Sequence, residues 1–415
     1  MKIVLCYPPF VTPVFGPPLG LLYLGSILRE QGHEVSVYDI NPGLFKMFPQ
    51  GWKYSRDFEL PPDHAAVTYA YEHIYEYCEK ILAEEPDVVG FSLLYCNYKF
   101  GIKMAEILAR KVRCIAGGPQ CTFHPEEMLQ LGCFHAIATG YGEESIFDML
   151  YADGVFSKNL KKEREYLPDY SFVSLHDYNG MLPVVTTRGC PCRCHFCTHH
   201  LPYYYHEINT IARILENAKD VKKIMFNDSN LNANPERTKA LFQRLALLKN
   251  TIPIHIVGMQ VLKGVEEYVH LMAQSGVTEA RLGIESGSLR ERISMNKPAF
   301  TNELALAVIK ELTRFNITAF VQFIFCYPDQ TEEDRQETVR FMSRVNRECD
   351  AQYVRHNWYQ FVVHHGTEAF FNMRYGVTTT SPNTWENTMY NPGKIRAIGE
   401  EYKNIVPENC QLFVD

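Results

Sequence analysis

The chain has 415 residues, of which 46% are hydrophobic and 21% are charged. This length and balance allow two or three separate hydrophobic cores and exclude a disordered chain. The formal net charge is −7 and no run of Lys or Arg is present, so we expect no nucleic-acid partner.

The N-terminal residues 1–9 are one short apolar run ended by two prolines, too brief for the core of a signal peptide. Nowhere do about 18 apolar residues run together, so we expect no membrane span. Thirteen cysteines are present, and four of them lie between positions 190 and 197. In a large chain without an export signal, this usage indicates reduced thiols in the cytoplasm, some of them metal ligands.

Apolar runs rich in β-branched residues alternate with helical patterns along residues 1–150. This alternation predicts a Rossmann-like, flavodoxin-like domain with a parallel sheet built from βαβ units. Residues 20–30 repeat leucine and isoleucine at helical spacing, and Gly32 is expected to end that helix. The predicted strands are 2–6, 34–39, 88–93, 114–116 and 136–139.

Three loops that follow these strands carry small residues at the carboxyl edge, where open α/β sheets bind ligands. They begin at Ser92, Gly117 and Gly140. Glycine lets the backbone approach a bulky ligand closely, and a serine hydroxyl can donate to a polar group on it. Glycines after a strand also suit a plain structural turn. The predicted cofactor-binding residues are Ser92, Leu94, Gly117, Gly118, Gly140, Gly142 and Glu143.

The order of these loops, together with the segment 17–24, resembles the cobalamin-binding domains that are fused to radical SAM enzymes. The resemblance implies that this domain binds cobalamin. The Asp-x-His-x-x-Gly motif, which supplies a histidine to cobalt in other cobalamin proteins, is absent, so the resemblance implies a cobalt without a histidine below it. The alternative is a flavodoxin-like domain that kept its glycines for turns and binds nothing.

The densest cysteine cluster is Cys190-Pro-Cys192-Arg-Cys194-His-Phe196-Cys197. Iron-sulfur clusters are usually held by four Cys thiolates, and three ligands leave one iron open. The C-x3-C-x2-C spacing of Cys190, Cys194 and Cys197 resembles that of the radical SAM superfamily. There the open iron of a [4Fe-4S] cluster binds S-adenosylmethionine (SAM), and the resulting 5'-deoxyadenosyl radical starts the reaction. The resemblance implies these three cysteines as metal ligands and Phe196 near the adenine.

Three alternatives remain at this motif. Relatives generally carry an aromatic or polar residue where this chain has Cys192, which is either a bystander, as its place inside the first spacer favours, or a competing fourth thiolate. The same cysteines with His195, His199 and His200 are also zinc-ligand types, but no second Cys-x-x-Cys is present. Phe196 equally suits core packing.

Strand and helix signals continue to alternate behind the cluster, which predicts a partial (β/α)6 TIM-type barrel with its functional residues at the carboxyl ends of strands. Asn227 and Asp228 end one strand, and the resemblance implies that they receive the SAM amino group. Glu285 and Ser286 end another, near the expected SAM ribose and carboxylate. The predicted strands are 184–187, 223–226, 254–258, 279–284, 319–325 and 353–361.

Two further expectations concern this half of the chain. Glu285 has an alternative role in a buried ion pair with Arg281 or Lys297. Thr331 is expected to cap the helix that follows it.

We divide the chain into a cobalamin-binding domain (1–152), a linker (153–180), a radical SAM barrel (181–365) and a C-terminal segment that closes the barrel mouth (366–415).

The resemblance covers about residues 1–370 and implies a radical SAM methyltransferase that methylates an unactivated carbon with methylcobalamin and a 5'-deoxyadenosyl radical. The substrate is expected to be a small molecule, a peptide or a lipid precursor, with flavodoxin or ferredoxin as electron donor. One alternative is a radical rearrangement, ring contraction or cyclisation in which cobalamin donates no methyl group. A second alternative is a non-catalytic cobalamin or iron-sulfur sensor.

Overall fold

The structure is a computed structural model that describes residues 1–9, 16–48, 64–161, 164–198, 201–297, 300–363, 367, 378–381, 384–386 and 390–413. The chain divides into two compact units, Met1–Leu182 and Pro183–Asp415. All thirteen cysteines are free thiols. His199 and His200, which the zinc alternative invoked, lie outside the described residues.

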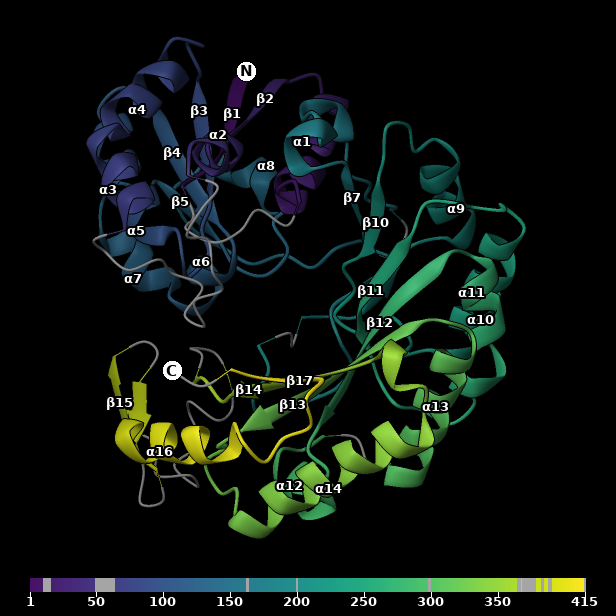
Figure 1. The fold of residues 1–415 in the computed structure, drawn as a ribbon. Coiled ribbons are helices and arrows are strands. Elements are labelled where there is room, and N and C mark those ends of the chain that lie inside the picture. Colours follow the sequence, from purple (N-terminus) through teal and green to yellow (C-terminus); the bar gives the residue numbers. More distant parts are fainter. Residues whose placement is uncertain are drawn as a thin grey trace. The chain divides into compact units, whose positions relative to one another are not determined.

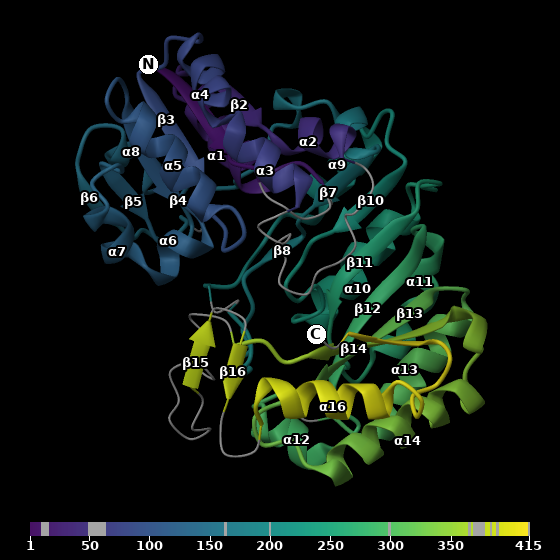
Figure 2. The ribbon, with the colours of Figure 1, turned by 60° about the vertical axis from the view of Figure 1, so that its left-hand side comes forward.

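The first unit contains a six-stranded parallel sheet in the order β2-β1-β3-β4-β5-β6 (Figure 1, with β6 labelled in Figure 2). The first three strands are buried or half-buried runs of β-branched residues, which is why they could be predicted. The predicted flavodoxin-like sheet is confirmed. Its strands are β1 (Lys2–Tyr7), β2 (Glu34–Asp39), β3 (Val88–Ser92), β4 (Arg113–Gly117), β5 (Ala136–Ala138) and β6 (Gly154–Phe156).

Most helices of the first unit share one hydrophobic core with this sheet, to which Val4, Val89, Phe100 and Met104 contribute. α1 packs separately, against β1 and β2. The helices are α1 (Leu19–Glu30), α2 (Asn41–Met47), α3 (Ala65–Glu72), α4 (Ile74–Leu82), α5 (Tyr98–Leu108), α6 (Pro119–Phe123), α7 (Pro125–Gln130) and α8 (Ile146–Met149), with the 3-10 turns η1 (Tyr170–Phe172) and η2 (Leu175–Tyr178).

The segment 153–180, predicted as a linker, folds into the first unit. β6 pairs with β5, and the Tyr178 hydroxyl donates to Asp39 Oδ2 over 2.7 Å. Arg29 Nη1 donates to Asp169 Oδ2 over 2.5 Å. The compact first unit therefore extends to Leu182 and includes this segment. A three-residue strand is too short to show an apolar pattern, which is why the sequence did not reveal it.

The second unit contains a seven-stranded sheet in the order β17-β14-β13-β12-β11-β10-β7 (Figure 2). The neighbouring pairs from β10 to β17 run parallel, which confirms the predicted partial barrel. The strands are β7 (Met181–Val184), β10 (Lys223–Phe226), β11 (Ile254–Met259), β12 (Val277–Glu285), β13 (Thr318–Phe325), β14 (Val354–Gln360) and β17 (Cys410–Phe413). β17 was not predicted.

The first barrel strand differs from the predicted range 184–187. β7 ends at Val184, and β8 (Thr187–Arg188) pairs instead with β9 (Tyr204–Tyr205) in a small antiparallel ladder. The reason is that the backbone N–H groups of Thr186 and Thr187 donate to Asp228 Oδ1. This side chain draws the chain out of the sheet before β8.

Helices alternate with the strands of the second unit, and Thr331 caps α14 as predicted. Its hydroxyl accepts from the Asp334 N–H over 3.3 Å, while Asp334 Oδ2 accepts from the Thr331 N–H over 2.7 Å. No described helix is long and apolar enough to cross a membrane. The remaining elements are α9 (Ile208–Glu216), α10 (Pro235–Ala246), η3 (Val265–Glu267), α11 (Val269–Gln274), α12 (Leu289–Ser294), α13 (Asn302–Arg314), α14 (Glu332–Glu348), η4 (Ala351–Tyr353), β15 (Thr378–Ser381), β16 (Thr384–Glu386) and α16 (Pro392–Tyr402).

Candidate functional site

The four clustered cysteines lie in the loop between β8 and β9 of the second unit. Gly189 opens this loop with a φ of +71°, and a Cβ on it would lie 2.4 Å from the carbonyl oxygen of Pro202. Glycine is required there because the chain both adopts a left-handed conformation and folds back onto itself. Cys194 is buried, and Phe196 and Cys197 are half-buried.

The sulfurs interact electrostatically within the loop. The Cys192 thiol donates to Cys190, which lowers the pKa of Cys190 to about 6 and raises that of Cys192. Burial raises the pKa of Cys194 to about 12, and the charges of Cys190 and Cys197 act in the same direction. Within the parts of the chain that the structure describes, no three His, Cys, Asp or Glu side chains are gathered as a ready site for a metal ion.

Two side-chain amides donate to these sulfurs from the ends of β10 and β11. Asn230 Nδ2 lies 3.5 Å from Cys190 Sγ and 3.9 Å from Cys192 Sγ. Gln260 Nε2 lies 2.9 Å from Cys192 Sγ. Asn230 is buried, and its Oδ1 has no hydrogen-bond partner within the part of the chain that the structure describes. The carboxyl edge of the sheet therefore presents polar side chains to the cysteine loop.

The cysteine loop is also fixed to the end of α12. The His195 N–H donates to the carbonyl oxygen of Met295 over 2.9 Å, and His195 Nδ1 lies 3.0 Å from that of Ser294. Asn296 Nδ2 donates to the carbonyl oxygen of Arg193 over 2.7 Å. The backbone between Cys192 and Phe196 is therefore held on both sides.

Asp228 joins the ends of β7 and β10. Its Oδ1 accepts from the N–H and hydroxyl groups of both Thr186 and Thr187. Its Oδ2 is buried and has no hydrogen-bond partner among the described residues, and burial raises the pKa of this carboxyl to about 6. Asn227 is exposed. One oxygen of Asp228 therefore holds the fold while the other is available as an acceptor.

Glu285 ends β12 with a φ of +67°, a strained conformation for a residue with a side chain. Its Oε1 accepts from Lys297 Nζ over 2.9 Å, so the ion pair that was the alternative reading of Glu285 is present. Burial lowers the pKa of Lys297, but the charges of Glu285 and Cys194 outweigh it and the net shift is upward. A buried cation therefore stands beside Cys194.

Ser286 is fully buried behind Glu285. Its Oγ accepts from the Ser288 N–H over 2.9 Å and lies 3.2 Å from Thr338 Oγ1. These contacts tie the end of β12 to α14. A ligand that reached the Ser286 hydroxyl would have to replace one of them.

In the first unit, the loops after β3 and β4 pack directly on each other. Gly118 has a φ of +102°, and a Cβ there would lie 2.6 Å from the carbonyl oxygen of Leu93. The Leu93 N–H donates to the carbonyl oxygen of Gly117 over 2.8 Å. Asn97 Oδ1 accepts from the Leu94 N–H over 2.7 Å, and Asn97 Nδ2 donates to the Ser92 carbonyl over 3.3 Å.

The loop after β5 joins the same edge through Thr122. The Thr122 hydroxyl donates to the carbonyl oxygen of Gly118 and accepts from the Gly140 N–H, both over 3.0 Å. A Cβ on Gly142 would meet Leu24 at 3.4 Å, and Glu143 is buried. The structure therefore brings the predicted residues of the first unit together at one edge of its sheet.

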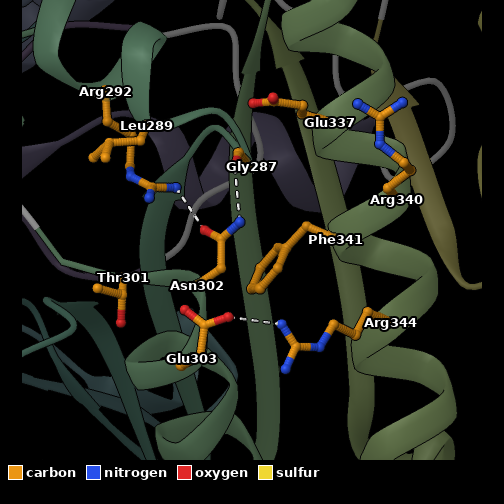
Figure 3. Close-up of a pocket in the computed structure, with 10 residues that line it drawn as sticks. All are labelled: Gly287, Leu289, Arg292, Thr301, Asn302, Glu303, Glu337, Arg340, Phe341 and Arg344. Atoms are coloured by element: carbon orange, nitrogen blue, oxygen red, sulfur yellow. Dashed lines mark hydrogen bonds and ion pairs between the residues drawn. The ribbon is translucent and has the colours of Figure 1, made fainter.

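A separate cavity of about 460 Å³ lies between α12, α13 and α14 (Figure 3). Arg292 Nη1 donates to Asn302 Oδ1 over 3.0 Å, and Arg344 Nη1 donates to Glu303 Oε1 over 3.1 Å. None of the predicted site residues lines this cavity. It lies apart from the strand ends that carry the cysteine loop's amide donors.

Residues 184–342 match the family described as the radical SAM superfamily. This part of the chain is a radical SAM domain. The match begins at the end of β7, includes the four cysteines and extends into α14. The predicted membership of the radical SAM superfamily is confirmed for this domain.

Relatives and solved structures agree with this domain and extend beyond it. An uncharacterised methyltransferase of Pyrococcus horikoshii is 26% identical over 392 residues, which cover 83% of this chain and 78% of the relative. A bacteriochlorophyllide d C-12(1)-methyltransferase of Chlorobaculum tepidum is 29% identical over 279 residues, 62% of this chain and 60% of the relative.

Two solved structures share the fold. TsrM of Kitasatospora setae, a radical SAM methyltransferase with cobalamin and a [4Fe-4S] cluster bound, has a TM-score of 0.69 at 15% identity and covers 89% of this chain and 76% of its own. The cobalamin-dependent radical SAM enzyme OxsB, with aqua-cobalamin bound, has a TM-score of 0.68 at 16% identity and covers 89% of this chain and 60% of its own.

The donor set of the radical SAM domain fits an iron-sulfur cluster. Cys190, Cys194 and Cys197 supply three thiols in one loop, and Cys194 lies within electrostatic range of both others. Amide donors and a buried Lys297 surround them, which suits a group whose sulfurs carry negative charge. The assignment of these cysteines, of Phe196 and of the strand-end residues as ligands stays a prediction.

Three residues that line the cysteine loop of the radical SAM domain were not among the predicted site residues: Asn230, Gln260 and Lys297. Asn230 lies four residues after the predicted strand 223–226 and Gln260 two residues after the predicted strand 254–258, so their closeness to strand ends was a usable signal. Lys297 appeared only as an ion-pair alternative, because nothing in its own sequence context indicates that it reaches the cysteines. Cys192 was expected to be a bystander, yet its sulfur has two amide neighbours.

Proposed function

We propose that this chain is a cobalamin-dependent radical SAM methyltransferase that methylates an unactivated carbon. The observation that carries the proposal is the three-cysteine loop of the radical SAM domain, held among amide donors at the carboxyl edge of a parallel sheet. The relatives named as methyltransferases and the fold shared with two cobalamin-dependent enzymes support the same reaction.

Cys190, Cys194 and Cys197 would hold the [4Fe-4S] cluster. When bound, the cluster supplies the electron that cleaves SAM, and cobalamin carries the methyl group. The residues around the loop prepare this site: Asn230 donates to the Cys190 sulfur, and α12 fixes the backbone of the loop. A rigid loop keeps the three sulfurs in one arrangement while the charge of the site changes.

The residues that would receive SAM are those at the ends of β10 and β12. The unpartnered Oδ2 of Asp228 suits a protonated amine, which needs an acceptor in a buried site. Asn227, Glu285, Ser286 and Phe196 are the other proposed contacts. Glu285 would share its carboxylate between Lys297 and the ligand, since the ion pair occupies Oε1.

The carboxyl edge of the first unit would hold cobalamin. Gly117 and Gly118 leave the end of β4 without side chains, and Gly118, with a φ of +102°, lets this loop pack against the Leu93 carbonyl at the end of β3. The half-buried Thr122 bridge holds the loop at Gly140 in register with these loops. Ser92, Leu94, Gly142 and Glu143 complete the proposed contacts.

We propose a small molecule as the substrate, with a peptide or a lipid precursor as the alternatives. TsrM binds tryptophan in a solved structure of 15% identity, which shows that this fold accepts a small aromatic substrate. We propose flavodoxin or ferredoxin as the electron donor, and the cytoplasm as the location, in keeping with thirteen free thiols.

A radical rearrangement, ring contraction or cyclisation would leave the substrate without a new methyl group, and a sensor would consume no SAM. The deciding experiment is anaerobic reconstitution with iron, sulfide, cobalamin, SAM and a low-potential reductant. We expect 5'-deoxyadenosine to form from SAM, and the label of methyl-labelled SAM to appear on the protein's cobalamin. Cleavage of SAM without labelled cobalamin would favour the rearrangement, and no cleavage would contradict the proposal.

A further inference from the structure

The sulfur of Cys192 is held by the ends of two strands. Gln260 Nε2 donates to it over 2.9 Å, and Asn230 Nδ2 lies 3.9 Å away. Its neighbour Cys190 receives the other contact of Asn230, over 3.5 Å. Cys192 is therefore half-buried with its sulfur in contact with both amides, although nothing in the proposed reaction needs it.

A fourth thiol in the cysteine loop would inactivate the proposed site if it ligated the open iron. The three-cysteine cluster works only while its fourth iron stays open to SAM, and four thiolates close such a cluster into an electron-transfer centre. Cys192 lies in the same short loop as Cys190 and Cys194, so its sulfur needs little backbone movement to reach a cluster there. Something must therefore keep it aside.

Gln260 is positioned to hold the Cys192 sulfur in place. Its backbone is clamped by Asn232, whose Oδ1 accepts from the Gln260 N–H and whose Nδ2 donates to the Gln260 carbonyl, both over 2.8 Å. Asn232 is fully buried, and the Leu231 N–H donates to the carbonyl oxygen of Gly258 over 3.0 Å. The Gln260 side chain therefore starts from a fixed backbone, and its amide reaches one sulfur only.

We propose that Gln260 is a positioning residue that holds the Cys192 thiol off the cluster and so keeps the fourth iron open for SAM. This inference rests on the proposed function. It explains why a fourth cysteine is tolerated inside the motif. It also means that Gln260 affects SAM binding by holding Cys192 and not by contacting SAM.

The test compares Gln260→Leu, which removes the donor at similar volume, with the wild-type protein after anaerobic reconstitution of both. We expect both to hold four irons per chain. The electron paramagnetic resonance signal of the reduced wild-type cluster should change when SAM is added, whereas that of Gln260→Leu should not. SAM affinity, measured by equilibrium dialysis, should fall by about tenfold or more.

The double variant Gln260→Leu with Cys192→Ala separates this mechanism from damage to the fold. If Cys192 closes the cluster, removing its sulfur restores SAM binding to that of Cys192→Ala alone. Gln336→Leu, at an exposed glutamine whose amide donates to Glu332, is the matched control and should behave as wild type.

Unchanged SAM binding in Gln260→Leu would overturn the inference, and so would a double variant that fails to recover. A wild-type protein that assembles no cluster would instead overturn the proposed function on which the inference rests.

Discussion

The two proposed cofactor regions are built in opposite ways. The cysteine loop of the second unit is surrounded by side chains that converge from several elements, including Asn230, Gln260 and Lys297. The glycine loops of the first unit depend on missing side chains, because Gly118 follows β4 where a Cβ would lie 2.6 Å from the carbonyl oxygen of Leu93. The first region is thus defined by side-chain contacts and the second by close backbone packing.

The difference has a practical consequence for mutation. In the cysteine loop, removing a side chain removes a function, because each thiol or amide makes a specific contact. At Gly118, adding a side chain does the damage, because a Cβ would meet the backbone of Leu93, which cannot move away. The following predictions test this contrast, from the largest expected effect to the smallest.

The largest effect is expected at the cluster ligands. Cys190→Ala, Cys194→Ala or Cys197→Ala should abolish iron binding, because two thiolates cannot hold a cluster that needs three. Iron and sulfide are measured after anaerobic reconstitution. Cys192→Ala is the matched control in the same loop and should retain its iron. Equal loss in all four variants would contradict the ligand assignment.

The second prediction concerns the glycine loops. Gly118→Ala should destabilise the protein by about 3 kcal/mol, because the residue has a φ of +102° and its Cβ would lie 2.6 Å from the carbonyl oxygen of Leu93. It should also lose cobalamin binding. Denaturant unfolding and cobalamin absorbance measure the two effects.

Gly132→Ala distinguishes the cost of backbone strain from the cost of the steric clash that is expected at Gly118. Gly132 has a φ of +72°, but no atom lies within 4 Å of the Cβ position. Its substitution should cost about 1 kcal/mol and leave cobalamin binding intact. Equal effects at Gly118 and Gly132 would show that backbone strain, and not a steric clash at the sheet edge, causes the loss.

The buried carboxyl of Glu291, on α12 of the second unit, gives a prediction of how the stability depends on pH. Burial raises the pKa of Glu291 from 4.5 to about 8, and the charges of Asp334 and Asp329 add to this, while Gln330 Nε2 donates to its Oε1 over 2.8 Å. The folded state therefore binds the proton more tightly than the unfolded chain, and this part of the stability is lost as the pH rises through 8.

Glu291→Gln should remove this loss while keeping an acceptor for Gln330. At pH 8.5 the variant should be more stable than wild type by about 2 kcal/mol, and the difference should shrink at pH 5.5. Thermal unfolding at the two pH values measures it. A difference that grows toward pH 5.5 would contradict the protonated state assigned to Glu291.

The smallest effect is expected at a position that serves neither region. Thr331→Ala removes the side chain that caps α14 and should cost about 1 kcal/mol. Thr331→Ser retains the hydroxyl and should recover most of it, as judged by denaturant unfolding. Loss of cluster assembly in Thr331→Ala would mean that stability, and not local chemistry, limits the site.

The same contrast separates what the sequence could predict from what it could not. Buried strands such as β1 and β3 are long apolar runs, and the cysteine spacing is readable directly, so the fold and the cluster motif were predicted. β6 has three residues, and β7 ends early because Asp228, more than forty positions away, draws Thr186 and Thr187 out of the sheet.

Contacts between distant residues explain the other differences. The ion pair of Glu285 with Lys297 and the contact of Gln260 with Cys192 join residues 12 and 68 positions apart. Neither pair shares a local pattern, since each depends on how separate strand ends meet at one edge. The role of Cys192 therefore became visible only once its neighbours were known.

The central claim is that three cysteines hold an iron-sulfur cluster with one open iron. Its most direct test is Mössbauer spectroscopy of anaerobically reconstituted, ⁵⁷Fe-labelled protein, with and without SAM. We expect a four-iron cluster in which SAM changes the signal of one iron and leaves the other three unaltered. A colourless protein that carries zinc, or a cluster whose four irons all ignore SAM, would contradict it.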